Sequence, residues 1–129
     1  MRLLLTMGLA ASLAASGCAT DATAWLPASQ MSGTYASGDG LGRTVVVHVH
    51  PDGTYRADWS GCLGTDGRSA GIWSLSGERL QFQPHNESGR MRGYLGRATV
   101  LRHGGRIGFA RDQDVDNARI DPDQLFLQE

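Results

Sequence analysis

The stretch RTVVVHVHPDGTYRADW at residues 43–59 restricts the fold of this chain more than any other part of its sequence. Apolar and polar residues alternate on both sides of residues 51–53, where proline suits the start of a type I turn and glycine suits the left-handed position of a three-residue loop. A two-residue loop would instead place the valines beside Arg56 and Asp58, because a slip of one residue turns every side chain to the other face. We therefore expect a hairpin with these apolar pairs on one face: Val49 with Tyr55, Val47 with Ala57, and Val45 with Trp59.

Two further stretches predict hairpins of the same kind. GIWSLSGERLQFQP at residues 71–84 can turn at its Gly-Glu pair, and RATVLRHGGRIGFAR at residues 97–111 can turn at its Gly-Gly pair. In the second of these the two faces are less distinct, because Arg102 would share a face with Ile107. The apolar pairs that these turns predict are Leu75 with Leu80, Trp73 with Phe82, and Val100 with Phe109.

A first strand near residues 33–36 and a last one at residues 124–128 bring the number of expected strands to about eight. No helical period of useful length occurs in residues 31–129. Consecutive hairpins form an antiparallel meander, and a meander of this size can close into a barrel, which removes its exposed edges. We therefore expect an all-β domain that forms a small lipocalin-like barrel with a mostly filled interior. A strongly curved open sheet and a small sandwich are the alternatives.

The first 17 residues are typical of an export signal. Met1 and Arg2 precede an apolar run over residues 3–13, and small residues follow. At about 1.5 Å per residue the run spans about half of a hydrocarbon core, so we expect no permanent transmembrane helix. The sequence LAASGC at residues 13–18 resembles a bacterial lipobox, with Ala15 at the position that usually holds leucine.

The lipobox resemblance implies that residues 1–17 are removed and that Cys18 carries acyl chains such as palmitate. One chain anchors a protein only marginally, whereas two or three hold it on a membrane. Ala19, in place of aspartate, implies the outer membrane, with the domain facing the periplasm. Residues 18–30 would then be a tether and residues 31–129 a single domain. The alternative is an ordinary signal peptide, cut nearby, that releases a soluble secreted or periplasmic protein.

Charge and motifs exclude several classes of function. The chain has 12 basic residues, all arginine and scattered, against 13 acidic ones, which gives a net charge of −1. Without a basic block, the sequence predicts no nucleic-acid partner. It contains no phosphate-binding loop, no dinucleotide-binding motif and no Gly-x-Ser-x-Gly. We therefore expect neither a cofactor nor an enzymatic activity.

Cys62 is the second cysteine and has no partner within the chain if Cys18 carries lipid. We expect a buried, inert thiol, because a free cysteine packs like a small hydrophobic residue. The alternatives are a disulfide to another molecule or, without lipid, a Cys18–Cys62 disulfide. A secreted enzyme with Cys62 as nucleophile would need a base such as His85 or His103 close by.

Three short motifs, G-T-Y at residues 33–35, D-G-T-Y at residues 52–55 and G-x-W-x-x-x-G at residues 71–77, follow one another in residues 32–84. This order resembles the N-terminal barrel of NlpE-type envelope lipoproteins, which implies a similar fold and a similar location in the cell. That family has a Cys-x-x-Cys pair after its first Gly-x-Tyr. This chain has no cysteine at residues 37–40, so the resemblance does not imply redox or copper sensing through paired thiols.

A first candidate metal site lies on the hairpin at residues 43–59. His48 and His50 are two residues apart and point to the same face, where Asp58 and Arg56 join them. Neutral imidazoles bind zinc at about 2.0–2.1 Å, and Asp58 would be a third ligand or a hydrogen-bond acceptor behind one. Because Arg56 would repel a cation, the alternative is an ordinary polar outer face.

A second candidate metal site is DQDVDNARIDPD at residues 112–123. Four of its aspartates fall at positions 1, 3, 5 and 12 of a calcium-binding loop. Asn117 stands where glycine is usual, Arg119 where an apolar residue is usual, and a strand precedes the segment in place of a helix. The alternative is an acidic, solvated connection. The four candidate ligands are Asp112, Asp114, Asp116 and Asp123.

The sequence as a whole predicts a membrane-anchored envelope lipoprotein that acts as a non-catalytic binding or structural module. Its partners would be the membrane, through the lipid, and an envelope protein or a small ligand. A metal-binding module is the first alternative, and an enzyme that uses Cys62 is the second.

Overall fold

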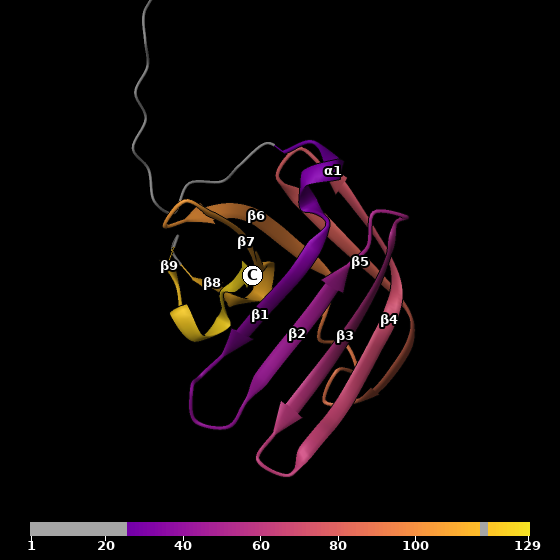
Figure 1. Cartoon of the computed structure of the whole chain (residues 1–129), viewed down its shortest axis with the longest axis vertical. Helices are drawn as coiled ribbons and strands as arrows, with labels where there is room; N and C mark the ends of the chain where they lie inside the picture. Colours follow the sequence, from indigo (N-terminus) through magenta and orange to yellow (C-terminus); the bar gives the residue numbers. More distant parts are fainter. Residues whose placement is uncertain (1–25, 117–118) are drawn as a thin grey trace, which may run out of the picture.

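The computed structural model describes residues 26–116 and 119–129, and within them the all-β prediction is confirmed. Eight antiparallel strands form a closed barrel in the order β1-β10-β7-β6-β5-β4-β3-β2 (Figure 1), so neither an open sheet nor a sandwich forms. Residues 1–25, with Cys18, lie outside the described residues. The barrel strands are β1 (Gly33–Gly38), β2 (Thr44–Val49), β3 (Thr54–Gly61), β4 (Gly64–Ser76), β5 (Arg79–Gly89), β6 (Arg97–His103), β7 (Arg106–Arg111) and β10 (Phe126–Gln128).

Short elements precede β1 and follow β7. The helix α1 (Ala28–Met31) overlaps the stretch that the sequence assigns to a tether, and Met31 at its end is fully buried. No helix in residues 26–116 or 119–129 is long and apolar enough to cross a membrane. Between β7 and β10 the chain forms η1 (Asp112–Asp114), β8 (Val115–Asp116), β9 (Arg119–Ile120) and η2 (Pro122–Gln124).

The three predicted hairpins have the predicted registers. Thr54 O accepts a hydrogen bond from His50 N at 2.9 Å, and Gly53 has φ of +90°, as the three-residue loop requires. Arg102 does face Ile107 in the third hairpin. The confirmed pairs are Val49–Tyr55, Val47–Ala57, Val45–Trp59, Leu75–Leu80, Trp73–Phe82 and Val100–Phe109.

Aromatic side chains fill the interior of the barrel. The ring of Phe109 lies at the centre of this group, 4.6 Å from the ring of Phe126, 5.2 Å from that of Tyr35 and 5.5 Å from that of Phe82. All four residues are at most 1% exposed. Because inward positions alternate along each strand, Val45, Val47 and Val49 of β2 and Leu80 of β5 complete the same core.

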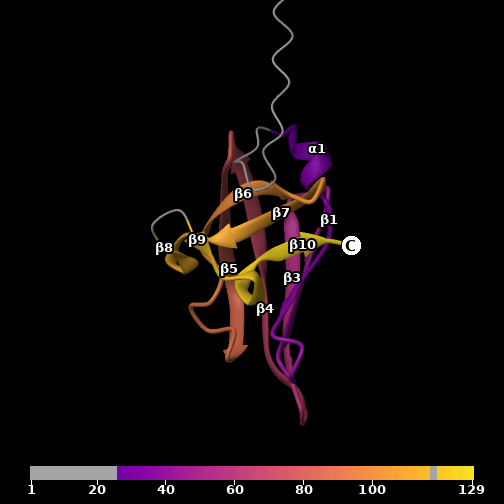
Figure 2. The ribbon, with the colours of Figure 1, turned by 90° about the vertical axis from the view of Figure 1, so that its left-hand side faces the viewer.

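A second, smaller core lies on the outer face of the barrel. Leu101 of β6 and Ala110 of β7 point outward and are nevertheless buried, because Leu125 and the half-buried Ile120 pack on them. The segment from η1 to η2 therefore covers this face, and β8 and β9 lie beside β6 and β7 in both views (Figures 1 and 2). The expected acidic connection is thus an ordered part of the fold.

Three of the ladders that close the barrel are short. The ladder between β5 and β6 has three residue pairs, at residues 79–81 of β5. The strand β10 is bonded through two pairs to β1 and through two pairs to β7. The strands β4 and β5 approach each other closely at the bulge, because a Cβ at Gly71 would collide with the backbone of Gln83 and Pro84.

The two ends of the barrel differ. At the first, which we call the α1 end, α1 lies beside the loop at residues 50–53 (Figures 1 and 2). At the other, which we call the Trp59 end, the turns at residues 39–43 and 62–63 project from the barrel (Figure 1). The chain enters the barrel at the α1 end, so whatever precedes residue 26 is attached there.

Candidate functional site

Arginine side chains stack on aromatic rings at the Trp59 end. The guanidinium carbons of Arg43 and Arg90 lie 5.5 Å and 6.0 Å from the centroid of the Trp59 ring. Trp59 in turn meets Tyr94 edge to face, with ring centroids 5.1 Å apart. Such cation–π contacts hold a flexible arginine in one place, so Trp59 serves as a platform for two cationic groups.

A surface pocket of about 550 Å³ opens beside this platform, a volume within the usual range for small-ligand sites. Arg90 in the pocket wall is bonded to Asp66, with 2.7 Å between Nε and Oδ2, and both side chains are more than half exposed. The residues that line the pocket are Arg43, Trp59, Gly61, Cys62, Leu63, Gly64, Thr65, Asp66 and Arg90.

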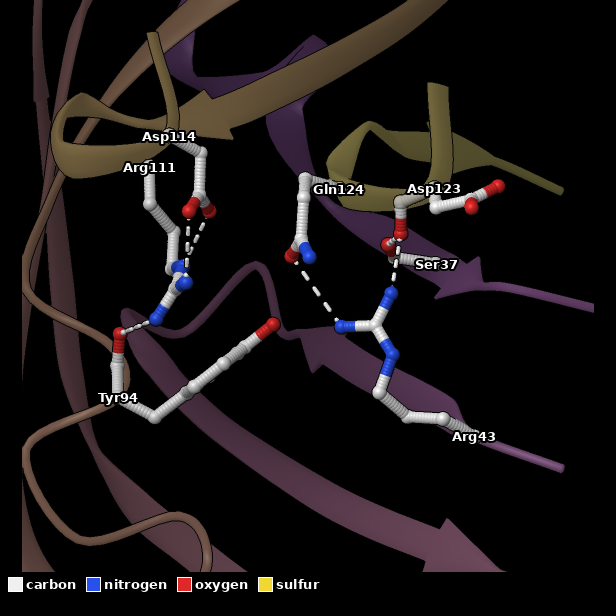
Figure 3. A network of polar contacts seen from close by, with 7 residues as sticks. All are labelled: Ser37, Arg43, Tyr94, Arg111, Asp114, Asp123 and Gln124. Atoms are coloured by element: carbon white, nitrogen blue, oxygen red, sulfur yellow. Dashed lines mark hydrogen bonds and ion pairs between the residues drawn. The ribbon is translucent and has the colours of Figure 1, made fainter. Parts of the chain in front are cut away.

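Arg43 has no carboxylate partner among the described residues. Its guanidinium donates to Gln124 Oε1 at 3.2 Å and to the backbone oxygen of Asp123 at 2.5 Å (Figure 3). Both acceptors are uncharged groups of η2. Ser37 donates to the same oxygen of Asp123 at 2.8 Å, which fixes η2 against β1. The half-buried Arg43 is therefore held by neutral groups and keeps an uncompensated positive charge.

Asp39 is the acidic residue closest to Arg43 in the sequence, and its carboxylate is used within its own turn. It accepts hydrogen bonds from the backbone N–H of Leu41 at 2.8 Å and of Arg43 at 3.2 Å. These two bonds are the main reason why the pKa of Asp39 lies below its ordinary value, and the Arg43 charge lowers it further. Asp39 thus shapes the turn that presents Arg43 without forming an ion pair with the guanidinium.

Arg111 is a third arginine stacked on a ring, and a carboxylate neutralises its charge. Its guanidinium carbon lies 3.7 Å from the Tyr94 centroid, and Nε and Nη2 donate to both oxygens of Asp114 at 2.6 Å and 2.9 Å (Figure 3). The two side chains are 9% and 13% exposed. The remaining guanidinium nitrogen, Nη1, donates a third hydrogen bond to the backbone oxygen of Tyr94 at 3.1 Å. This pair therefore holds the fold together, whereas Arg43 is left available.

Tyr94 lies between the two arginines, and its hydroxyl points toward the Arg43 side (Figure 3). The residue is 9% exposed, and the hydroxyl is buried with no hydrogen-bond partner among the described residues. Burial raises the pKa of this hydroxyl, while the charges of Arg111 and Arg43 act in the opposite direction. Tyr94 therefore brings a buried hydroxyl close to the guanidinium of Arg43.

The expectation that Cys62 is a buried thiol is wrong, because the residue is exposed and its thiol is free. Cys62 and Leu63 form the two-residue tip between β3 and β4, where no other layer of the protein covers them. Leu63 is 105% exposed, and Leu41 on the neighbouring turn is 88% exposed. The two turns touch, since a Cβ at Gly42 would collide with the sulfur of Cys62.

The structure does not gather the candidate zinc ligands. His48 Nδ1 is 3.1 Å from the hydroxyl of Thr34, and Asp58 faces Arg68, with 3.4 Å between Oδ1 and Nε. His50 directly follows the last residue of β2, and its backbone oxygen accepts a hydrogen bond from the indole N–H of Trp73 at 2.8 Å. In residues 26–116 and 119–129 no three histidine, cysteine or acidic side chains form a group that could hold a metal ion.

The candidate calcium ligands are also used in other ways. Asp112 accepts a hydrogen bond from Thr99 at 3.0 Å, and Asp114 holds Arg111. Asp123, the last ligand of the predicted loop, is exposed, and the short elements η1, β8, β9 and η2 take the place of a calcium-binding loop. The side chain of Asp116 lies outside the described part of the chain.

The hypothesis of a Cys62 nucleophile requires a nearby base. Neither His85 nor His103 lines the pocket that Cys62 borders. His85 instead borders a different pocket, with His50, on the side of β3–β5. Among the described residues, the geometry therefore places no histidine in the wall of the pocket that Cys62 borders.

The sequence predicted Trp59 only as a core partner of Val45, and it predicted no role for Arg43, Arg90 or Tyr94. Comparison with protein-family models, with curated proteins and with solved structures finds no match for this chain. The pocket beside Trp59 is consequently interpreted from its own chemistry.

Proposed function

We propose that this protein is a lipid-anchored envelope lipoprotein whose barrel is a non-catalytic binding module, and that the Trp59 end is its binding surface. The anchor part of the proposal is supported by the lipobox-like LAASGC at residues 13–18. The binding part is supported by one observation: Arg43 lines a pocket of about 550 Å³ with a charge that no carboxylate of the described residues neutralises.

The positions of the two ends agree with this function. A lipid on Cys18 would be connected to the α1 end, because the chain enters the barrel there. The turn at residues 62–63, whose residues line the pocket, lies at the opposite end (Figure 1). An anchored barrel can therefore direct its pocket away from its own membrane and toward a component of the periplasm.

The anchor is tested by changing each cysteine separately in a diderm bacterium. Cys18→Ala is expected to move the protein from the membrane fraction to the soluble fraction and to remove the mass of the acyl chains, because several chains together hold a protein on a membrane. Cys62→Ala is the matched control and is expected to change neither property, because Cys62 is at the opposite end of the barrel. Intact mass and membrane fractionation measure both. Equal membrane partition of the Cys18→Ala protein would refute the anchor.

The binding end is tested by photo-crosslinking in intact cells. A photoreactive residue at Leu63, beside the pocket, is expected to capture an envelope component that the same residue at Asp52, in the loop at the α1 end, does not capture. Both positions are exposed to solvent, so the two variants differ in the end of the barrel that carries the photoreactive group and not in how accessible that group is. Identical products from the two positions, or none from Leu63, would refute the assignment of the Trp59 end.

A further inference from the structure

We propose that the pocket beside Trp59 binds an organic anion with a single negative charge, a carboxylate or a phosphodiester, whose apolar part packs against Leu63. This inference rests on the proposed function and names the chemistry of the ligand. Four observations on the described residues carry it: the charge of the pocket, its surplus of hydrogen-bond donors, its rigidity and its exposed apolar side chain.

The charge of the pocket fits one negative charge. Arg43, Arg90 and Asp66 are its ionised side chains, and together they carry a net charge of +1. Arg90 is already bonded to Asp66 at 2.7 Å, so the surplus charge belongs to Arg43. A singly charged anion would neutralise it, whereas a doubly charged one would leave an excess of negative charge.

The hydrogen-bond donors also need an acceptor. A guanidinium has five N–H donors, and two of those of Arg43 find acceptors in η2. The bonds to η2 leave further N–H groups of this guanidinium for an acceptor from outside the protein. Carboxylate and phosphodiester oxygens accept charge-assisted N–H bonds from guanidinium groups.

The site is rigid in its cationic part. Arg43 is stacked on Trp59 and tied to Asp123 and Gln124, so less side-chain freedom is lost when an anion binds. Arg111 provides the comparison within the same molecule: it is stacked on Tyr94 in a similar way, and its anion is Asp114. An external anion at Arg43 would occupy the place that Asp114 occupies at Arg111.

The pocket also has an exposed apolar side chain. Leu63 is 105% exposed although it lines the pocket together with Trp59. Burying such a side chain against an apolar group of a ligand is favourable in proportion to the apolar area removed from water. A ligand with a charged head and an apolar body therefore fits the pocket better than an inorganic ion.

The test is a titration of the purified full chain, in nonionic detergent if it is acylated, with two anionic probes and one neutral probe. The anions are 4-phenylbutyrate and dibutyl phosphate, and the neutral probe is 4-phenylbutyramide. The readout is the indole N–H signal of Trp59 in nitrogen–proton NMR spectra, assigned with Trp59→Phe. The indole of Trp73, bonded to His50 O at the α1 end, is the internal reference. We expect saturable shifts of Trp59 with at least one anion and no shift of Trp73.

Three variants complete the test. Arg43→Gln is expected to weaken anion binding about tenfold or more, the effect of losing a charged hydrogen bond. Arg79→Gln removes the same charge from the far end of the β4–β5 hairpin and is expected to change nothing. Asp66→Asn raises the net charge of the pocket and is expected to tighten binding several-fold, a gain that no loss of structure can imitate.

The outcomes separate the ligand from the function. Binding of one anion only would identify the head group as carboxylate or phosphodiester. No shift, equal shifts with the neutral amide, or unchanged binding by both Arg43→Gln and Asp66→Asn would refute the anion. If the Leu63 crosslink still forms in that case, the proposed function stands and only the ligand chemistry is wrong.

Discussion

Replacing Asp114 by alanine is expected to lower the free energy of unfolding by about 3–5 kcal/mol, the usual cost of removing one partner of a buried ion pair. Arg111 would keep its charge in a position that is 8% exposed, against the ring of Tyr94, with only a backbone oxygen as acceptor. Urea unfolding followed by circular dichroism measures the loss as a lower midpoint with an unchanged slope.

Two controls distinguish the unpaired charge from a general effect on η1. Asp112→Ala removes a neighbouring, exposed carboxylate that accepts one hydrogen bond from Thr99, and it is expected to cost about 1 kcal/mol or less. The double variant Arg111→Met with Asp114→Leu removes both charges and is expected to recover more than half of the loss. A double variant as unstable as Asp114→Ala would contradict the explanation by an unpaired charge.

Phe109→Ala is expected to destabilise the barrel by about 3–5 kcal/mol, because it leaves a cavity at the centre of the core. The Phe109 ring contacts the rings of Tyr35, Phe82 and Phe126, at centroid distances from 4.6 Å to 5.5 Å. These come from three other strands, so one deletion removes contacts from β1, β5 and β10 together. Thermal and urea unfolding measure the change.

Leu41→Ala is the control for the loss of apolar side-chain atoms. Leu41 is 88% exposed, so its truncation is expected to change the free energy of unfolding by about 0.5 kcal/mol or less. Phe109→Leu keeps much of the volume and is expected to cost less than Phe109→Ala. A loss for Phe109→Ala no larger than that for Leu41→Ala would show that the aromatic cluster does not hold the barrel.

The fold could be predicted from the sequence because side-chain alternation and turn residues determine each hairpin register. The predicted pairing of Val45 with Trp59 also determines which residue lies next to Trp59 in the candidate binding site. Arg43 lies two residues before Val45, so the same register places it at the next inward position, beside Trp59. Arg111 likewise follows Phe109 by two residues. An arginine at an inward position at the end of a strand was therefore the signal that the sequence analysis did not use.

The partners of these arginines could not be predicted from the sequence. Asp114, Asp123 and Gln124 belong to the segment between β7 and β10, whose path depends on how Ile120 and Leu125 cover the outer face of the barrel. No periodic pattern of apolar and polar residues in this segment predicts that path. The same is true of Cys62, whose exposure depends on the length of the tip between β3 and β4 and not on the alternation of the strands beside it.

The pairing of β1 with β10 determines when the barrel can be completed. Gln128 and Tyr35 are 93 residues apart in the sequence and lie opposite each other in the ladder. During synthesis β1 can join β2 early, but its other edge has no partner until residues 126–128 are available. Closing so long a loop is slow, and an unpaired edge is prone to pair with other chains. Protection of the edge of β1 until β10 has been made is therefore a requirement that this topology places on the cell.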